Sequence, residues 1–104
     1  MDRKDLVKNL KEFKKKIGKK YKVNEIILFG SRATNNYKKE SDVDLIVVGR
    51  FKGRNNLKRA PPLYLEWELN LPVDFLCFTP QEFEKLRKKV SIVREALSQG
   101  IIIR

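Results

Sequence analysis

The sequence predicts an α/β fold in which a small β-sheet packs against helices. Apolar residues recur at helical spacing near the N-terminus, three short apolar runs follow, and a helix-capping sequence precedes a second periodic segment. The predicted order is helix, strand, helical turn, strand, short helix, strand, helix and strand. The 104 residues fit one domain spanning residues 1–104, and this small size leaves an oligomer or a partner subunit open.

Amphipathic helices are predicted near both ends of the chain. The first runs from about Arg3 to Lys20, and its apolar face consists of Leu6, Leu10, Phe13, Ile17 and Tyr21. The second follows Thr79-Pro80-Gln81-Glu82, a capping box with proline at the first helical position. Its apolar positions are Phe83, Leu86, Val90, Val93 and Leu97, and it ends at Gly100.

Three apolar runs, at residues 26–29, 43–48 and 73–78, predict buried strands, and residues 101–103 can add an edge strand. A polar segment, residues 30–41, joins the first two strands and has a helical turn starting near Ser31. Residues 49–60 read as a basic loop, and a short helix over residues 63–69 follows Pro61-Pro62. The cations of this loop are Arg50, Lys52, Arg54, Lys58 and Arg59.

The charge balance favours anionic partners. Twenty-four lysines and arginines face 13 acids, for a net charge of +11, which suits nucleotides, nucleic acid or an acidic protein. The N-terminus is charged from Asp2 onward and has no signal-peptide pattern, and no apolar run is long enough to span a membrane. With a single cysteine, a disulfide framework is excluded and a cytoplasmic location is expected.

The absence of histidine narrows the chemistry. Neither the usual zinc sites nor a Ser-His-Asp or Cys-His arrangement can form within the chain. Any metal must be held by oxygen ligands, which points to Mg²⁺ or Mn²⁺. Cys77 lies in an apolar run and is interpreted as a small core residue, and Trp67 is interpreted as packing.

Two carboxylates at the start of the second strand carry the strongest chemical signal. Asp42 and Asp44 are two residues apart, so in a strand both side chains point to one face. Carboxylates held this close repel each other, and a divalent cation between them removes the conflict. Mg²⁺ usually combines one or two carboxylates with water and substrate phosphates. The pair therefore predicts a metal that shares a phosphate substrate.

A Gly-Ser turn precedes these carboxylates. Gly30 has no Cβ, so a phosphate can approach its backbone, and the free N–H groups at a helix start suit phosphate oxygens together with the Ser31 hydroxyl. Arg32 can contact a phosphate or pair with a nearby acid. Ser41 is a further nucleotide-binding candidate, and its alternative role is to cap a local turn.

Asp74 is the single charge in the third apolar run. A carboxylate there is costly unless it is paired, bound to metal or facing water. If this strand lies beside the strand of Asp44, Asp74 joins the same cluster. It can then share a second metal and accept the proton of an attacking hydroxyl.

Together these residues resemble a known family. Phe29-Gly30-Ser31-Arg32-Ala33 with Ser41-Asp42-Val43-Asp44-Leu45-Ile46-Val47 closely resembles the signature of the minimal nucleotidyltransferases of the DNA polymerase β-like superfamily. The resemblance covers almost the whole chain and implies an α/β (α+β) fold with a mixed sheet. It also implies Mg²⁺-dependent transfer of a nucleoside monophosphate, AMP from ATP, to an acceptor hydroxyl. Gly30 and Ser31 would grip the triphosphate, Asp42 and Asp44 would hold the metals, and Asp74 would be the third carboxylate.

The resemblance also bears on partners. Stand-alone minimal members resemble the antitoxins of two-gene pairs whose toxin is a helical HEPN-type ribonuclease, and this implies AMP transfer to a tyrosine of that partner. Members often carry a second glycine five residues after the first, where this chain has Asn35, a residue that tolerates the left-handed conformation.

Two other function classes stay open on the sequence. One is a non-catalytic antitoxin that neutralises a partner by contact alone, against which the intact carboxylates argue. The other is a basic nucleic-acid-binding module, suggested by the net charge and the loop over residues 49–60 but lacking any base-reading motif.

Overall fold

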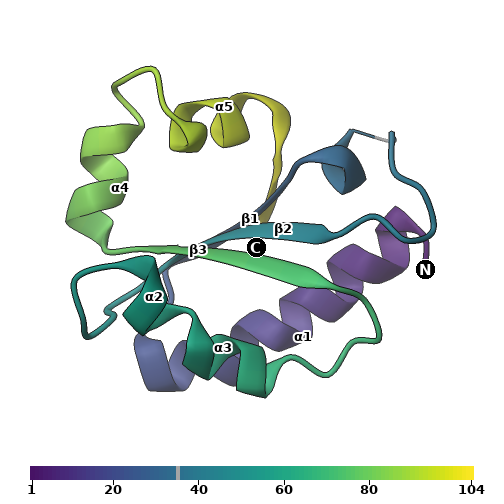
Figure 1. Cartoon of the computed structure of the whole chain (residues 1–104), viewed down its shortest axis with the longest axis horizontal. Helices are drawn as coiled ribbons and strands as arrows, with labels where there is room; N and C mark the ends of the chain where they lie inside the picture. The colour runs from purple at the N-terminus through teal and green to yellow at the C-terminus, as the bar shows by residue number, and fades with distance from the viewer. Residues whose placement is uncertain (35) are drawn as a thin grey trace.

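The sheet holds four strands in the order β3-β2-β1-β4 in the computed structural model, which describes residues 1–34 and 36–104 (Figure 1). The strands are β1 (Glu25–Phe29), β2 (Val43–Val48), β3 (Val73–Phe78) and β4 (Ile101–Ile103). β1 pairs antiparallel with β2 and with β4, whereas β2 and β3 are parallel. The sheet is therefore mixed, and the four predicted strands are all confirmed.

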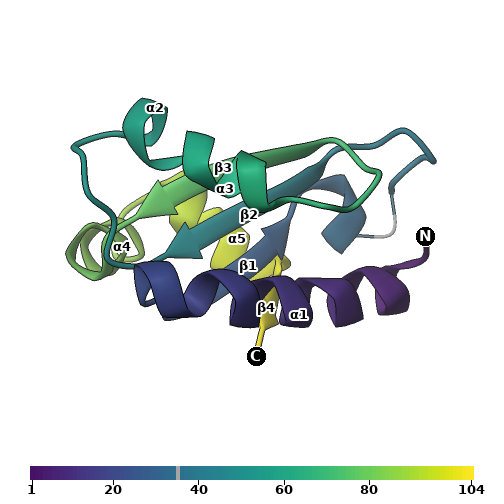
Figure 2. The same ribbon diagram turned by 90° about the horizontal axis from the view of Figure 1, so that it is seen from below.

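Helices cover both faces of the sheet. One face carries α1 (Arg3–Tyr21), α2 (Asn56–Arg59) and α3 (Pro61–Glu66), and the other carries α4 (Pro80–Leu86) and α5 (Ile92–Gln99) (Figures 1 and 2). A single 3₁₀ turn, η1 (Ser31–Ala33), joins β1 to the segment before β2. In the part of the chain that the structure describes, no helix combines the length and the apolar character needed to cross a bilayer.

The larger core lies between the sheet and α1. Leu6, Leu10 and Ile17 of α1 are fully buried, as their helical spacing predicts, and Asp2 begins the helix by accepting a hydrogen bond from Asp5 N at 2.8 Å. Phe13 packs edge-to-face on Trp67 and stacks on Phe75, with ring centroids 5.2 and 5.7 Å apart. Trp67 is thus a packing residue, as interpreted from the sequence.

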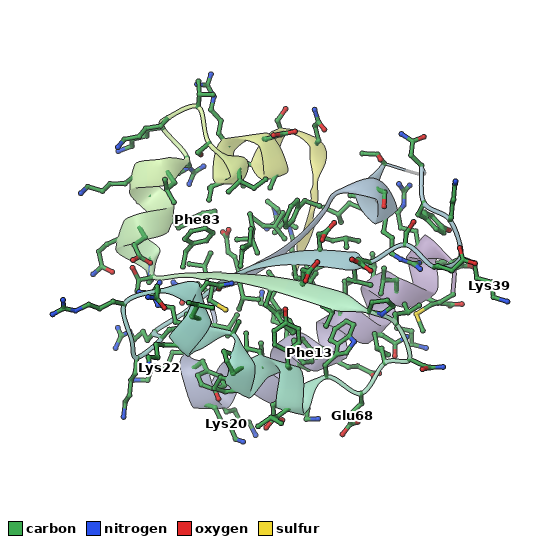
Figure 3. All side chains as sticks on the ribbon, in the orientation of Figure 1. Phe13, Lys20, Lys22, Lys39, Glu68 and Phe83 are labelled. Atoms are coloured by element: carbon green, nitrogen blue, oxygen red, sulfur yellow. The ribbon has the colours of Figure 1, made fainter. Side chains whose placement is uncertain are left out.

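A smaller core lies between the sheet and the α4–α5 layer. Phe83, Val93 and Ala96 are buried there against Ile46 and Val48 of β2. Phe83 and Phe13 lie on opposite sides of the sheet (Figure 3). Thr79 forms the predicted capping box at the start of α4, with its side chain accepting from Glu82 N while the Glu82 carboxylate accepts from Thr79 N.

The prediction of one continuous C-terminal helix was wrong. The chain leaves the helix after Leu86 and re-enters it at Ile92, so that Val90 is 95% exposed instead of lying on an apolar face. Ser91 stabilises the break from both sides. Its hydroxyl donates to Leu86 O at 2.6 Å, and its side chain accepts from Arg94 N as the N-cap of α5.

The basic loop over residues 49–60 contains the short helix α2, which the sequence did not predict. The Asn56 side chain binds the outer edge of β3, donating to Phe75 O at 2.7 Å and accepting from Cys77 N at 2.8 Å. Arg59 is buried, with 6% of its surface exposed. Its guanidinium donates hydrogen bonds to Gly53 O, Cys77 O and the Glu82 carboxylate. The loop is therefore tied to the sheet by side-chain hydrogen bonds.

Candidate functional site

The register of the sheet brings the Gly-Ser turn and two of the aspartates to one place. Asp44 lies opposite Phe29 of β1 on one side and opposite Asp74 of β3 on the other. Gly30 follows Phe29 directly, so the turn meets the start of β2. Asp44 therefore stands between the turn and Asp74 at one end of the sheet.

Gly30 fits closely against Asp44. Its φ of +74° lies in the left-handed region, which favours glycine. A Cβ at this position would collide with the Asp44 carboxylate oxygen Oδ2. The turn therefore brings exposed backbone without a side chain against the Asp44 carboxylate.

The three aspartates differ in exposure. Asp44 is half-buried, whereas Asp42 and Asp74 are exposed. The pKa of Asp44 is raised above its ordinary value, first by burial and then by the negative charges of Asp74 and Asp42. Within residues 1–34 and 36–104 no three acidic side chains form a finished metal-binding group, so the aspartates are electrostatic neighbours and not a preassembled ligand set.

Arg32 is buried beside this cluster, with 2% of its surface exposed. Its Nε donates to Ser41 O at 2.8 Å and its Nη2 to Lys39 O at 3.2 Å, while the guanidinium lies 5.0 Å from the centre of the Tyr37 ring. Arg32 thus ties the segment before β2 to the turn after β1. No contact in the described part of the chain pairs it with an acid, which was one of its two predicted roles.

Ser41 takes part in the same local structure. Its hydroxyl accepts a hydrogen bond from Lys38 N at 2.8 Å, and its carbonyl accepts from Arg32. The alternative role of a local cap is therefore the one that its side chain performs. Ser31 is half-buried at the first position of η1. The predicted role of Asn35 falls outside the described residues.

Sequence reasoning missed one residue near the turn. Arg3 of α1 donates from Nη1 to Ala33 O at 3.0 Å, which ties the N-terminal helix to the end of η1. The two residues are 30 positions apart and no local pattern joins them. Only the packing of α1 across the sheet could reveal this contact.

The donor chemistry at this end of the sheet suits a hard divalent cation. All the candidate ligands are carboxylate oxygens, and the described part of the chain offers no sulfur or imidazole beside them. The crowding of negative charge that raises the Asp44 pKa is relieved when a cation is shared. The missing Cβ of Gly30 lets the Asp44 carboxylate lie directly against the backbone of the turn.

Comparisons with known proteins identify related sequences and folds. A protein from Methanocaldococcus jannaschii named "Putative protein adenylyltransferase MJ0604" is 46% identical over 44 residues, which cover 40% of this chain and 44% of that protein. The match thus spans less than half of the relative's length.

Two solved structures share the fold. One is described as a "putative nucleotidyltransferase from Sulfolobus solfataricus" and superposes with a TM-score of 0.66 at 20% identity, covering 96% of this chain and 80% of that one. The other is described as a "toxin-antitoxin with AMP-PNP" and gives a TM-score of 0.59 at 22% identity, covering 90% and 72%. The sequence model of the nucleotidyltransferase domain matches residues 10–103. The chain belongs to the nucleotidyltransferase domain family.

Proposed function

We propose that the chain is a Mg²⁺-dependent nucleotidyltransferase that transfers a nucleoside monophosphate, AMP from ATP, to an acceptor hydroxyl. The observation that carries this proposal is the placement of Asp44 between the Gly30 backbone and Asp74. A phosphate-binding turn, a half-buried carboxylate and an exposed carboxylate thereby border one point at the end of the sheet.

The turn binds the triphosphate in this proposal. Gly30 is exposed and has no side chain, so the backbone before η1 is uncovered, and Ser31 supplies an N–H and a hydroxyl at the start of η1. Arg32 and Ser41 act by position, because their side chains hold the segment that leads into Asp42 and Asp44. This assigns them to the support of the nucleotide site and not to direct phosphate contact.

Asp42, Asp44 and Asp74 would hold Mg²⁺, with Mn²⁺ as a substitute and two ions at full occupancy. The bound cation neutralises charge on the phosphates and on the leaving pyrophosphate. Asp44 lies against the Gly30 turn, and Asp74, opposite it on β3, is exposed and open to an acceptor. Asp74 therefore accepts the proton of the acceptor hydroxyl. The hydroxyl oxygen then bonds to the α-phosphorus as the bond between this phosphorus and pyrophosphate breaks.

We propose a protein as the acceptor, through a tyrosine hydroxyl of a small helical HEPN-type partner. The name of the M. jannaschii relative, a protein adenylyltransferase, supports a protein acceptor. The neighbouring structure described as a toxin-antitoxin with AMP-PNP supports a nucleotide site within a two-protein system.

Transfer of label from α-labelled ATP tests the proposal. With Mg²⁺ and the co-expressed partner, wild type should place label on a protein, and Asp42→Asn/Asp44→Asn should not. Asp5→Asn is the matched control, because it removes an exposed aspartate of α1 that is none of the three proposed metal ligands. If no label transfers while the partner still binds and is silenced, the chain acts as a masking subunit and the proposal is wrong.

A further inference from the structure

A second concave site lies at the other end of β3. A pocket of about 340 Å³ is lined by residues of α2, of α4 and of the carboxyl half of that strand. Leu76, Phe78 and Leu86 form its apolar floor, and cationic side chains stand around its rim. The volume lies at the lower end of the range of ligand pockets, which is about 300 to 1,000 Å³.

Most directional hydrogen-bonding groups of this pocket are already engaged by the protein. Asn55 caps α2 by accepting from Lys58 N, and Asn56 binds both Phe75 O and Cys77 N of the strand edge. Arg59 and Glu82 bind each other, so their charges offset one another. These side chains build the wall of the pocket and leave little hydrogen-bonding capacity for a ligand.

Three cations of the rim have no such engagement. Arg54, Lys85 and Lys89 are exposed, and none of them forms an ion pair with any residue that the structure describes. They are long, flexible side chains above an apolar floor. What the pocket offers is therefore non-directional: apolar contact in the centre and positive charge around it.

We infer that this pocket binds a protein segment that presents an apolar side chain flanked by carboxylates. A nucleobase needs several directed hydrogen bonds, and both polar groups of the Asn56 side chain are already bound to the strand edge. A free phosphate would use the cations but leave the floor of Leu76, Phe78 and Leu86 in water. An apolar side chain between acidic neighbours satisfies both parts of the pocket, because the rim remains in solvent while the floor is covered.

The pocket is placed to serve a partner of the carboxylate site. Asp74, Leu76 and Phe78 alternate along β3, so all three side chains belong to one face of the sheet. Asp74 and Phe78 are four residues apart, or about 13 Å at the rise of a strand. A segment held in the pocket could thus present a hydroxyl to Asp74 within a few residues. This role rests on the proposed function, whereas binding itself does not.

Fluorescence anisotropy with a labelled pentapeptide, Glu-Glu-Phe-Glu-Glu, tests the binding. Lys85→Glu/Lys89→Glu should weaken its affinity about tenfold, because two attractions become repulsions. Lys11→Glu/Lys15→Glu is the matched control, since it makes the same charge change on exposed positions of α1 across the sheet. Thermal unfolding of each variant verifies that it is folded.

Three results would overturn the inference. Equal weakening by both double variants would mean that only net charge matters. Equal affinity for Glu-Glu-Ser-Glu-Glu would mean that the apolar floor does not contribute to binding. If a pentathymidylate binds more tightly than the peptide and its binding depends on the pocket, the ligand is a nucleic acid. Asp42→Asn/Asp44→Asn should bind the peptide as wild type does, so a failure of transfer and a failure of docking are distinguished.

Discussion

The two ends of the parallel pair β2–β3 differ in how their charged side chains are paired. At the amino end, Asp44 faces Asp74 in register, and Asp42 adds a third negative charge that no described cation offsets. At the carboxyl end, the buried guanidinium of Arg59 has an acceptor for each of its donating groups. The buried charge of Arg59 is thus satisfied by the protein's own groups, whereas the carboxylates at the amino end require a cation from outside.

The largest effect expected at the amino end comes from Gly30→Ala. The added Cβ collides with the Asp44 carboxylate and imposes strain at a φ of +74°, so transfer should fall about 100-fold or more. Gly18→Ala is the matched control, because nothing lies within 4 Å of its Cβ position. Transfer by Gly18→Ala should be unchanged, and retained transfer by Gly30→Ala would remove the turn from the active site.

At the carboxyl end, Arg59→Met should lower the free energy of unfolding by about 2–3 kcal/mol. The substitution keeps the aliphatic bulk but leaves Cys77 O and Gly53 O without this donor and the Glu82 carboxylate without its cation. Arg54→Met in the same loop should have almost no effect, because Arg54 is exposed and unpaired among the described residues. Urea unfolding of both variants measures the difference. Similar values for the two variants would contradict the comparison.

Asp44→Asn should raise the free energy of unfolding of the metal-free protein while transfer is lost. The pKa of Asp44 is raised by burial and by two neighbouring carboxylates, so its charge opposes folding when no cation is present. Unfolding in the presence of EDTA at neutral pH measures the gain, and Asp5→Asn should show none. A loss of stability in Asp44→Asn would mean that the carboxylate makes favourable contacts inside the protein.

Glu82→Gln should change how stability depends on acid. The Arg59 guanidinium, bound to Glu82, holds the pKa of that carboxyl below its ordinary value of 4.5. This ion pair therefore stabilises the folded state at pH values above the ordinary pKa of Glu82. The stabilisation is lost as the pH falls through the lower pKa that Glu82 has in the folded state. Titration of the urea midpoint from pH 6 to pH 3 should show a shallower fall in Glu82→Gln than in wild type. Exposed Glu84→Gln should follow the wild-type curve.

The smallest effect is expected at Val90. Because this side chain is 95% exposed at the break between α4 and α5, Val90→Lys should change the free energy of unfolding by less than about 0.5 kcal/mol. Val93→Ala, at a fully buried position of α5, should cost about 2 kcal/mol. If Val90→Lys proves as costly as Val93→Ala, the helix is continuous and the break at Ser91 is absent in solution.

Local sequence patterns predicted most of the fold because each strand or helix is marked by the residues within it or directly before it. The apolar runs over residues 26–29, 43–48 and 73–78 became β1, β2 and β3, and the capping box at Thr79 begins α4. The error at Val90 has a physical cause. Apolar residues keep helical spacing through residues 87–91. This spacing carries no information about the hydrogen bonds by which Ser91 ends one helix and begins the next.

The sequence predicts which residues form the candidate site. It does not predict the strand register and the long-range contacts that hold them in place. The alternation of Asp42 and Asp44 and the turn at Gly30 are local, so the sequence shows them directly. The register that puts Asp74 opposite Asp44 depends on the parallel pairing of two strands, and it was stated only as a condition. The burial of Arg59 arises from a carboxylate 23 positions away, so the basic loop gave no sign of it.

The hydrogen bonds of Asn56 to the outer edge of β3 limit how this sheet can grow. By occupying Phe75 O and Cys77 N, one amide side chain takes the place of a further strand. A second chain can extend the sheet only beside β4, unless Asn56 is first displaced. A sheet that grows at one edge alone ends when two copies meet there, so self-association by strand addition stops at a closed pair and does not continue into a fibre.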